Sequence, residues 1–305
     1  LQELTSTYDQ FIAGKEITVE QEKGLTFSDY VFVERFRRQT KRYQNAMDFA
    51  LKVFKDLPEK ISIPTKCQPS LINKVHFNTL HTELDSLLMN KVLEISSHTS
   101  GICLNSLLMA CYFKLMNLWS GQNDLIINMP VFNREQHLPN AKNIIGSFLD
   151  IFPVRIQTSP QEPIVSIARK IEQFVRTMLE YPISSIELSR KIAEQEGLKQ
   201  SSLSAIIFSN SINMLPKGIS HSSRYLTIGA PKVQTGAPGT YIDLVMYTWE
   251  NKWCFDWNYV RELFDAEYIQ LLSEQFTSML NQLVDDTNTK GYEERSCSNI
   301  LPLFY

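Results

Sequence analysis

The sequence lacks the features that mark several common classes of protein. Its longest mostly apolar run, Ile102 to Phe113, is interrupted by Asn105 and Ser106 and is too short to cross a bilayer. Lys and Arg total 30 against 33 Asp and Glu, so the basic surplus that serves nucleic-acid binding is absent. We therefore expect neither a membrane segment nor a nucleic-acid partner.

Cysteines are few, and they show no metal-binding spacing. Five occur in 305 residues, and no two form a C-x-x-C pair. Cys103 and Cys111 fall inside an apolar helical pattern, where a thiol usually only packs. The sequence therefore predicts no metal site, and a reducing, cytoplasmic setting fits it best.

The start of the chain is informative. Leu1 is not a methionine, and no basic segment precedes an apolar one, so no signal peptide is visible. Leu1, Leu4, Tyr8 and Phe11 recur at helical spacing, as at the end of an amphipathic helix. We expect that a part of the protein upstream of Leu1 is absent from this sequence.

The periodicity of apolar residues predicts alternating helices and strands. Helices are expected over 26–56, 82–97, 102–119, 163–179, 185–196 and 265–284, the second opened by a capping box of Thr82 and Asp85. Strands are expected over 74–80, 124–131, 151–156, 203–208 and 225–228, and as a hairpin of 241–249 with 253–259. This order predicts an α/β fold with one mixed β-sheet flanked by helices.

Signatures of phosphate loops, zinc proteases and α/β-hydrolases are missing. His81 stands four residues before Asp85, a spacing that a general base and its orienting carboxylate sometimes show. We favour the simpler interpretation, in which His81 ends a strand and Asp85 caps a helix. Asp243 lies inside an expected strand, so it either pairs with an arginine such as Arg155 or lines a cleft.

Five segments, in this order, resemble motifs of the condensation domains of nonribosomal peptide synthetases. LTFSDYVFVERF (25–36) is similar to a Y-x-D-Y-A-x-W-like motif through Phe27, Asp29 and Tyr30. DLIINMPVFNRE (124–135) and NIIGSFLDIFPVRI (143–156) are similar to a strand ending in P-x-x-x-R and to I-G-x-F-x-N-T-x-P-x-R. LEYPISSIEL (179–188) resembles the H-Q-x-x-P segment, and residues 241–280 resemble the closing pattern that begins F-D-L.

The resemblance implies a chloramphenicol-acetyltransferase-like fold, in which two lobes face each other across a tunnel. It assigns residues 1–284 to the C-terminal part of a condensation domain, with 1–57 as a helical segment between the lobes, 58–284 as the second lobe and 285–305 as a linker or tail. The family's catalytic H-H-x-x-x-D-G motif is not in this sequence, and we expect it immediately upstream of Leu1. No catalytic residue is therefore assigned in this chain.

Such domains form an amide bond between an acyl or peptidyl thioester and an aminoacyl thioester. Both substrates are held on phosphopantetheine arms of carrier proteins. The implied partners are therefore those carriers and the N-terminal lobe. The resemblance implies that no cofactor binds directly. The resemblance places candidate tunnel residues at Asn133, Arg134, Gly146, Ser147, Phe148 and Asp150. It gives structural motif roles to Asp29, Tyr30, Arg155, Tyr181, Pro182 and Asp243.

Two departures from the family pattern leave the activity open. Asp150 and Ile151 replace an Asn-Thr pair, and the His-Gln pair ahead of Pro182 is lost. The first hypothesis is a peptide-bond-forming domain; the second is a non-elongating scaffold or carrier-docking module. The third is a free-standing acyltransferase that uses a soluble thioester such as coenzyme A.

Overall fold

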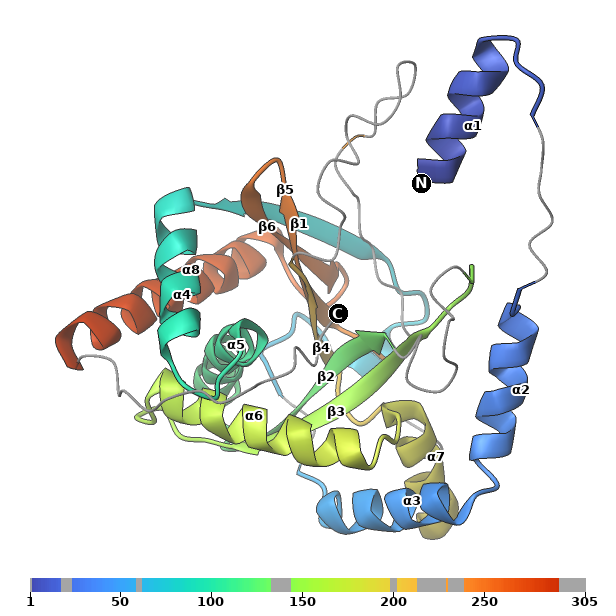
Figure 1. The fold of residues 1–305 in the computed structure, drawn as a ribbon. Coiled ribbons are helices and arrows are strands. Elements are labelled where there is room, and N and C mark those ends of the chain that lie inside the picture. Colours follow the sequence, from blue (N-terminus) through green and yellow to red (C-terminus); the bar gives the residue numbers. More distant parts are fainter. Residues whose placement is uncertain are drawn as a thin grey trace.

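A six-stranded mixed sheet forms the centre of the molecule (Figure 1), in the order β1-β6-β5-β4-β2-β3. The computed structural model describes residues 2–17, 24–58, 62–132, 144–197, 202–212, 229 and 239–290. The strands are β1 (Phe77–Leu84), β2 (Asp124–Phe132), β3 (Leu149–Gln157), β4 (Ile206–Ser211), β5 (Ile242–Trp249) and β6 (Lys252–Val260). β4 runs parallel to β2 and β5, and the other pairs are antiparallel. The predicted α/β fold is confirmed.

Helices cover one face of this sheet. They are α1 (Gln2–Ile12), α2 (Phe27–Arg37), α3 (Lys41–Val53), α4 (Ser86–His98), α5 (Leu104–Ser120), α6 (Ile164–Glu180), α7 (Ser185–Glu196) and α8 (Ala266–Lys290), with a 3₁₀ turn η1 (Pro69–Leu71). α4, α5, α6 and α8 form the covering layer, while α1 and α2 lie apart from it (Figure 1). None of these helices is long and apolar enough to cross a membrane.

Helix α5 is buried on every side, as its apolar sequence predicts. It packs against the sheet as well as against α6 and α8. Even Lys114 is buried, and its ammonium donates to the carbonyl of Glu162 at 2.8 Å. Gly121 ends the helix at φ 68°, a left-handed conformation that favours glycine.

Three of the expected elements differ in the structure. The helix expected over 26–56 is two helices, because the Thr40 hydroxyl accepts from the Tyr43 amide and starts α3 afresh. The capping box expected at Thr82 is wrong, because β1 continues to Leu84 by pairing with β6, and α4 begins at Ser86. α8 continues past Val284 to Lys290, and the strand expected at 225–228 lies outside the described residues.

The hairpin of β5 and β6 turns through Glu250 and Asn251, which have φ of 47° and 63°. Two successive left-handed residues are typical of a type I′ turn, whose twist matches the paired strands. Asparagine tolerates this conformation, whereas glutamate is strained in it. The turn is therefore a local weakness in an otherwise well-packed hairpin.

Glycine at position 250 should relieve that strain. Glu250→Gly is expected to raise the free energy of unfolding in urea by about 0.5–1 kcal/mol. The matched control Glu274→Gly, on the exposed face of α8, should lower it by about 1 kcal/mol. Equal destabilisation by both changes would contradict the assigned turn.

Candidate functional site

Two of the motif segments that are far apart in the sequence form one aromatic cluster. Phe27 and Tyr30 of α2 pack against Ile144 and Phe148. The ring of Phe148 lies edge-on to both, at centroid distances of 5.4 Å from Phe27 and 4.6 Å from Tyr30. The cluster holds α2 against the segment that leads into β3.

Asp29 and Gly146 make this contact possible in different ways. The Asp29 carboxylate accepts from the backbone amide of Thr26 at 2.7 Å and so completes the capping box that starts α2. These bonds to Thr26 lower the pKa of Asp29. Gly146 is required because a Cβ there would overlap the ring of Phe27. Its neighbours Ile145 and Ser147 are exposed, with Ile145 at 93%.

Asp150 lies just beyond this cluster, at the start of β3. Burial raises the pKa of its carboxyl, and the nearby carboxylates of Glu187 and Glu34 act in the same direction. The Ile151 amide, which donates to Asp150 at 2.8 Å, and the Arg37 guanidinium oppose this rise. The side chain is thus a half-buried acid whose charge is only partly compensated.

Charged groups from α3, from α7 and from Arg38, which follows α2, line a cleft. The Arg38 guanidinium contacts the Glu187 carboxylate at 2.7 Å, and Arg37 contacts Glu34 at 3.1 Å. The cleft holds about 360 Å³ and is also lined by Tyr43. It presents carboxylate and guanidinium groups to the same small volume.

Tyr181 and Pro182 connect these helices. The Tyr181 ring lies 4.8 Å from that of Phe49 in α3, and the Pro182 carbonyl accepts from Arg37 at 3.4 Å. Both residues therefore contact neighbouring helices. Asn133 and Arg134, the remaining candidate tunnel residues, lie outside the described residues.

Arg155 joins the sheet to the end of α3. Its guanidinium makes two bonds with Asp124, at 3.1 and 2.8 Å, and donates to the carbonyls of Val53, Lys55 and Asp56. The expected pair of Arg155 with Asp243 is wrong. β3 is an edge strand, and β2 and β4 separate it from β5, which carries Asp243.

Asp243 instead belongs to a row of residues that runs across the sheet. Cross-strand pairing places Thr79, Asn258, Asp243, Ile207 and Asn128 side by side on five strands. We call these five residues the polar row, because four of them are polar. Its Asp and Asn members are buried.

Hydrogen bonds between strands satisfy much of the polar row. Thr79 donates to Asn258 at 2.7 Å, and the Ser209 hydroxyl donates to Asp243 at 2.8 Å. Asn128 accepts from Ser185 of α7 at 3.0 Å. Among the described residues, no partner faces the amide nitrogen of Asn258.

A second polar pair stands beside this row. His81 and Asp256 are cross-strand partners on β1 and β6, and the imidazole Nδ1 lies 2.6 Å from the Asp256 carboxylate. His81 therefore contacts a residue distant in sequence, not Asp85, which occupies the N-cap position of α4 as expected. A hydrogen bond from the Tyr247 hydroxyl to Asp256 contributes to raising the pKa of Tyr247, after the larger effect of burial.

Sequence reasoning missed the polar face that Asp256 and Asn258 share with Asp243. The signal was present in β6, where Trp253, Phe255, Trp257 and Tyr259 were expected on one face. The residues between them are Cys254, Asp256 and Asn258, which a period of two places together on the other face. Their partners on β1 and β5 could not be assigned without the strand register.

The arrangement of these segments is shared with proteins of one family. Residues 1–299 match the family described as Condensation domain. The chain belongs to this family. Bacitracin synthase 1 of Bacillus licheniformis is 27% identical over 277 residues, which make up 89% of this chain and 5% of that relative. The condensation-domain chain thus spans a small part of the length of this curated relative.

Solved structures agree on the fold. The first condensation domain of the CDA synthetase aligns with a TM-score of 0.73 at 16% identity, over 93% of this chain and 60% of that one. The X-domain in its complex with OxyB from teicoplanin biosynthesis aligns with a TM-score of 0.74 at 17% identity, over 93% and 63%. The condensation-domain fold expected from the sequence is therefore confirmed.

The contact of Gly146 with Phe27 gives a test of the aromatic cluster. Gly146→Ala should lower the free energy of unfolding by about 1–3 kcal/mol, because the added methyl group overlaps the Phe27 ring. Phe27→Leu in the same chain should recover part of that loss, as measured by urea unfolding. Gly24→Ala is the control, since a Cβ at Gly24 meets no atom within 4 Å. Additive effects of the Gly146 and Phe27 changes would contradict the contact.

Asp150 should make stability depend on pH in a defined direction. Its folded pKa lies above the usual value of 3.8 for an aspartic acid, so ionisation of this carboxyl disfavours the folded state above that pH. Asp150→Asn keeps an acceptor for the Ile151 amide but removes the charge. The variant should melt at a higher temperature than the parent at pH 7, and this difference should shrink as the pH falls toward 3.8. An unchanged or lower melting temperature at pH 7 would contradict the assignment, with the exposed Asp48→Asn as the control.

Proposed function

We propose that this chain forms part of a condensation domain that makes amide bonds in nonribosomal peptide synthesis. It joins an acyl or peptidyl thioester to the amine of an aminoacyl thioester, both held on phosphopantetheine arms of carrier proteins in the cytoplasm. The observation that carries the proposal is the family match over residues 1–299. The relationship to a bacitracin synthase supports it.

The reaction requires the protein to position the amine against the thioester and to transfer one proton. The amine nitrogen attacks the thioester carbonyl, a C–N bond forms and the C–S bond breaks. One proton leaves the nitrogen, and the sulfur departs as a thiol. Holding the two arms in line therefore supplies much of the rate, and a general base manages the proton.

The polar face of the sheet suits such placement. We propose that the polar row lines the tunnel, where its side chains bind the amide groups of a pantetheine arm. The buried Asn258 amide supports this role, because buried donors normally have a partner and none is found for it among the described residues. The candidate tunnel residues of the motif segment would lie near β3, at the edge of the sheet opposite β1. They are Gly146, Ser147, Phe148 and Asp150.

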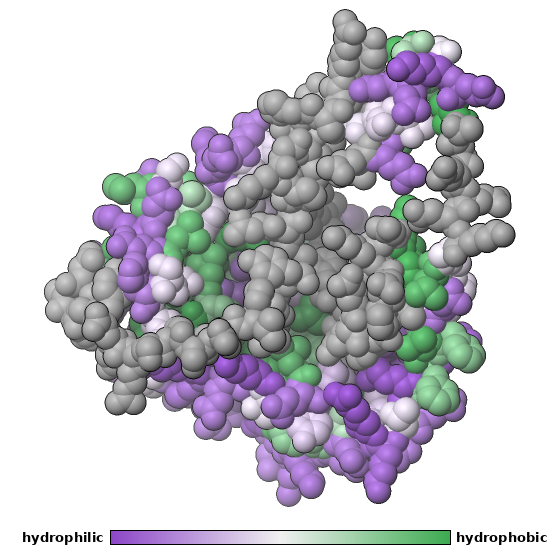
Figure 2. Space-filling view, viewed as in Figure 1, coloured by the Kyte–Doolittle hydropathy of each residue, from purple (hydrophilic) through white to green (hydrophobic). Residues whose placement is uncertain are grey.

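The general base would come from the N-terminal lobe. This chain aligns with 60% of the solved CDA condensation domain, which supports placing the histidine motif in the part without a counterpart here. We propose that residues 1–57 lie between the lobes, that 58–284 form the second lobe and that 285–305 form a linker or tail. Phe32 and Phe36 of α2 are 72% and 63% exposed, and Figure 2 shows apolar residues at the surface along this helix. Exposed aromatics of this size are typical of an interface.

A binding module is the second candidate. Asp150 replaces the family asparagine, and its charge is only partly compensated. The X-domain that shares this fold is found in a complex with OxyB. In this role the chain would dock carriers or another protein without joining their cargo.

An assay with loaded carriers separates these candidates. The complete polypeptide that contains this chain is mixed with an acyl-loaded donor carrier and an aminoacyl-loaded acceptor carrier. Intact-protein mass spectrometry should show the acyl group transferred to the acceptor, with loss of the donor thioester. Binding of both carriers without transfer would favour the docking module. Transfer from acyl coenzyme A but not from the donor carrier would favour a free-standing acyltransferase.

A further inference from the structure

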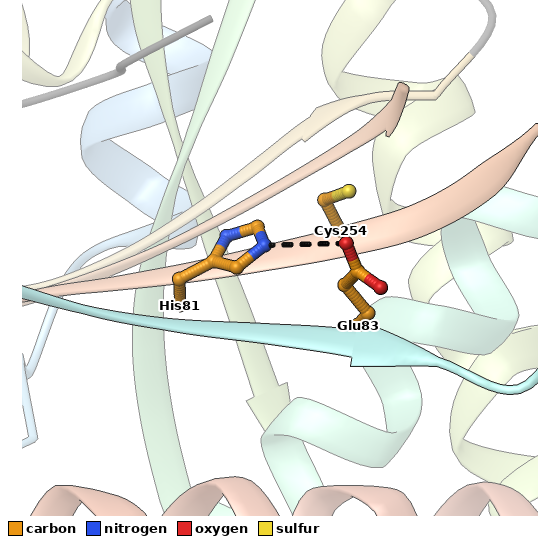
Figure 3. A group of neighbouring side chains, drawn as sticks. All are labelled: His81, Glu83 and Cys254. Carbon is orange, nitrogen blue, oxygen red and sulfur yellow. Dashed lines mark ion pairs between the residues drawn. The ribbon is translucent and has the colours of Figure 1, made fainter. Parts of the chain in front are cut away.

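Three different metal-binding side chains meet near one edge of the sheet. His81 and Glu83 come from β1 and Cys254 from β6, and all three point to the same side (Figure 3). One donor atom from each lies within 4.8 Å of the other two. The strand register fixes this placement, because Glu83 pairs with Cys254 and His81 pairs with Asp256.

The Asp256 carboxylate orients the imidazole of His81. Its carboxylate is 5% exposed and lies 2.6 Å from His81 Nδ1. A carboxylate accepts, so in the neutral imidazole a proton on Nδ1 satisfies Asp256 and leaves the lone pair of Nε2 available to a metal. Metal-binding histidines are commonly oriented in this way by an outer carboxylate.

Glu83 divides its two oxygens between different partners. Oε2 contacts the Lys252 ammonium at 2.6 Å, and Oε1 lies 3.9 Å from His81 Nε2. The ion pair therefore holds the carboxylate in place and leaves one oxygen beside the free imidazole nitrogen. Lys252 also offsets part of the negative charge that the donors would bring together.

Cys254 supplies the third donor atom of the group. Its side chain is almost fully buried, at 2% exposure, whereas the His81 and Glu83 side chains are 49% and 47% exposed. The site thus has a buried sulfur and two donors open to solvent.

We propose that His81 Nε2, a Glu83 oxygen and Cys254 Sγ bind a Zn²⁺ ion, with Asp256 as the orienting residue. Zn²⁺ accepts nitrogen, oxygen and sulfur ligands at about 2.0–2.3 Å in a tetrahedron, so neighbouring donors are roughly 3.3–3.8 Å apart. Small side-chain movements close the present gaps. The Cys254 thiol releases its proton to solvent when the metal binds.

The ion would join β1 to β6. β1 is an edge strand whose neighbour in the sheet is β6. A metal held by side chains of both strands stabilises their pairing by the free energy of its binding. The sequence predicted no metal site because the donors come from two strands that are far apart along the chain.

Titration of the purified, chelator-treated protein with Zn²⁺ and Co²⁺ tests the site. We expect one equivalent of Zn²⁺ to bind, and X-ray absorption at the zinc edge should show a single sulfur ligand at about 2.3 Å. Co²⁺ should give the charge-transfer absorption of a thiolate complex. No saturable binding, or a bound ion without sulfur, would overturn the proposal.

Substitutions locate the ion. Cys254→Ser and His81→Gln should each abolish the cobalt signal, while Asp256→Asn should weaken Zn²⁺ binding by about 10–100-fold. The controls Cys67→Ser and His98→Gln lie outside the site and should bind as the parent does. Circular dichroism verifies that each variant folds. Unchanged binding by the folded Cys254 and His81 variants would place the metal elsewhere and overturn the proposal.

Discussion

Asp243, Asp256 and Asn258 are buried polar side chains on the two strands of the β5–β6 hairpin, and each needs a partner on a neighbouring strand. An unpaired buried carboxylate costs several kcal/mol, so the strand register that pairs these groups is strongly preferred. A slip by one residue would bring Asp243 and Asn258 into the face that holds Leu244 and Trp257. The polar face thus helps to fix the register of the sheet.

The two faces of the sheet serve different purposes. On one, α5 and α8 bury the large apolar residues of the central strands in a continuous core. On the other, side-chain hydrogen bonds link β1 to β6 and β4 to β5. The proposed substrate contacts and the proposed metal site both use this second face. The packing of the apolar face supports both by holding the strands, and so the polar side chains, in place.

Much of the fold follows from local sequence signals. The all-apolar pattern of α5, the left-handed glycine at Gly121 and the alternation of Trp253 to Tyr259 gave elements that the structure confirms. Errors arose where two elements meet. Thr82 is a plausible helix cap in isolation, but pairing with β6 and a contact of its hydroxyl with Ser273 of α8 keep it in a strand.

The candidate site was harder to predict, for a physical reason. The motif resemblance singled out Tyr30, Gly146 and Phe148, and the structure brings them together. It gave no partner for Asp243 or His81, because a buried polar residue finds its partner through the strand order. Arg155 illustrates this limit: it is the right residue type for a buried aspartate, but it lies three strands away from Asp243 and pairs with Asp124.

The polar face of the sheet is the surface that we propose to meet the substrate arm. A crystal structure of the complete polypeptide with a non-hydrolysable aminoacyl-pantetheine analogue measures this directly. We expect the arm to lie along the polar row, with one of its carbonyl groups accepting from the Asn258 amide. An arm ordered elsewhere, or no bound arm at a saturating concentration, would contradict the account.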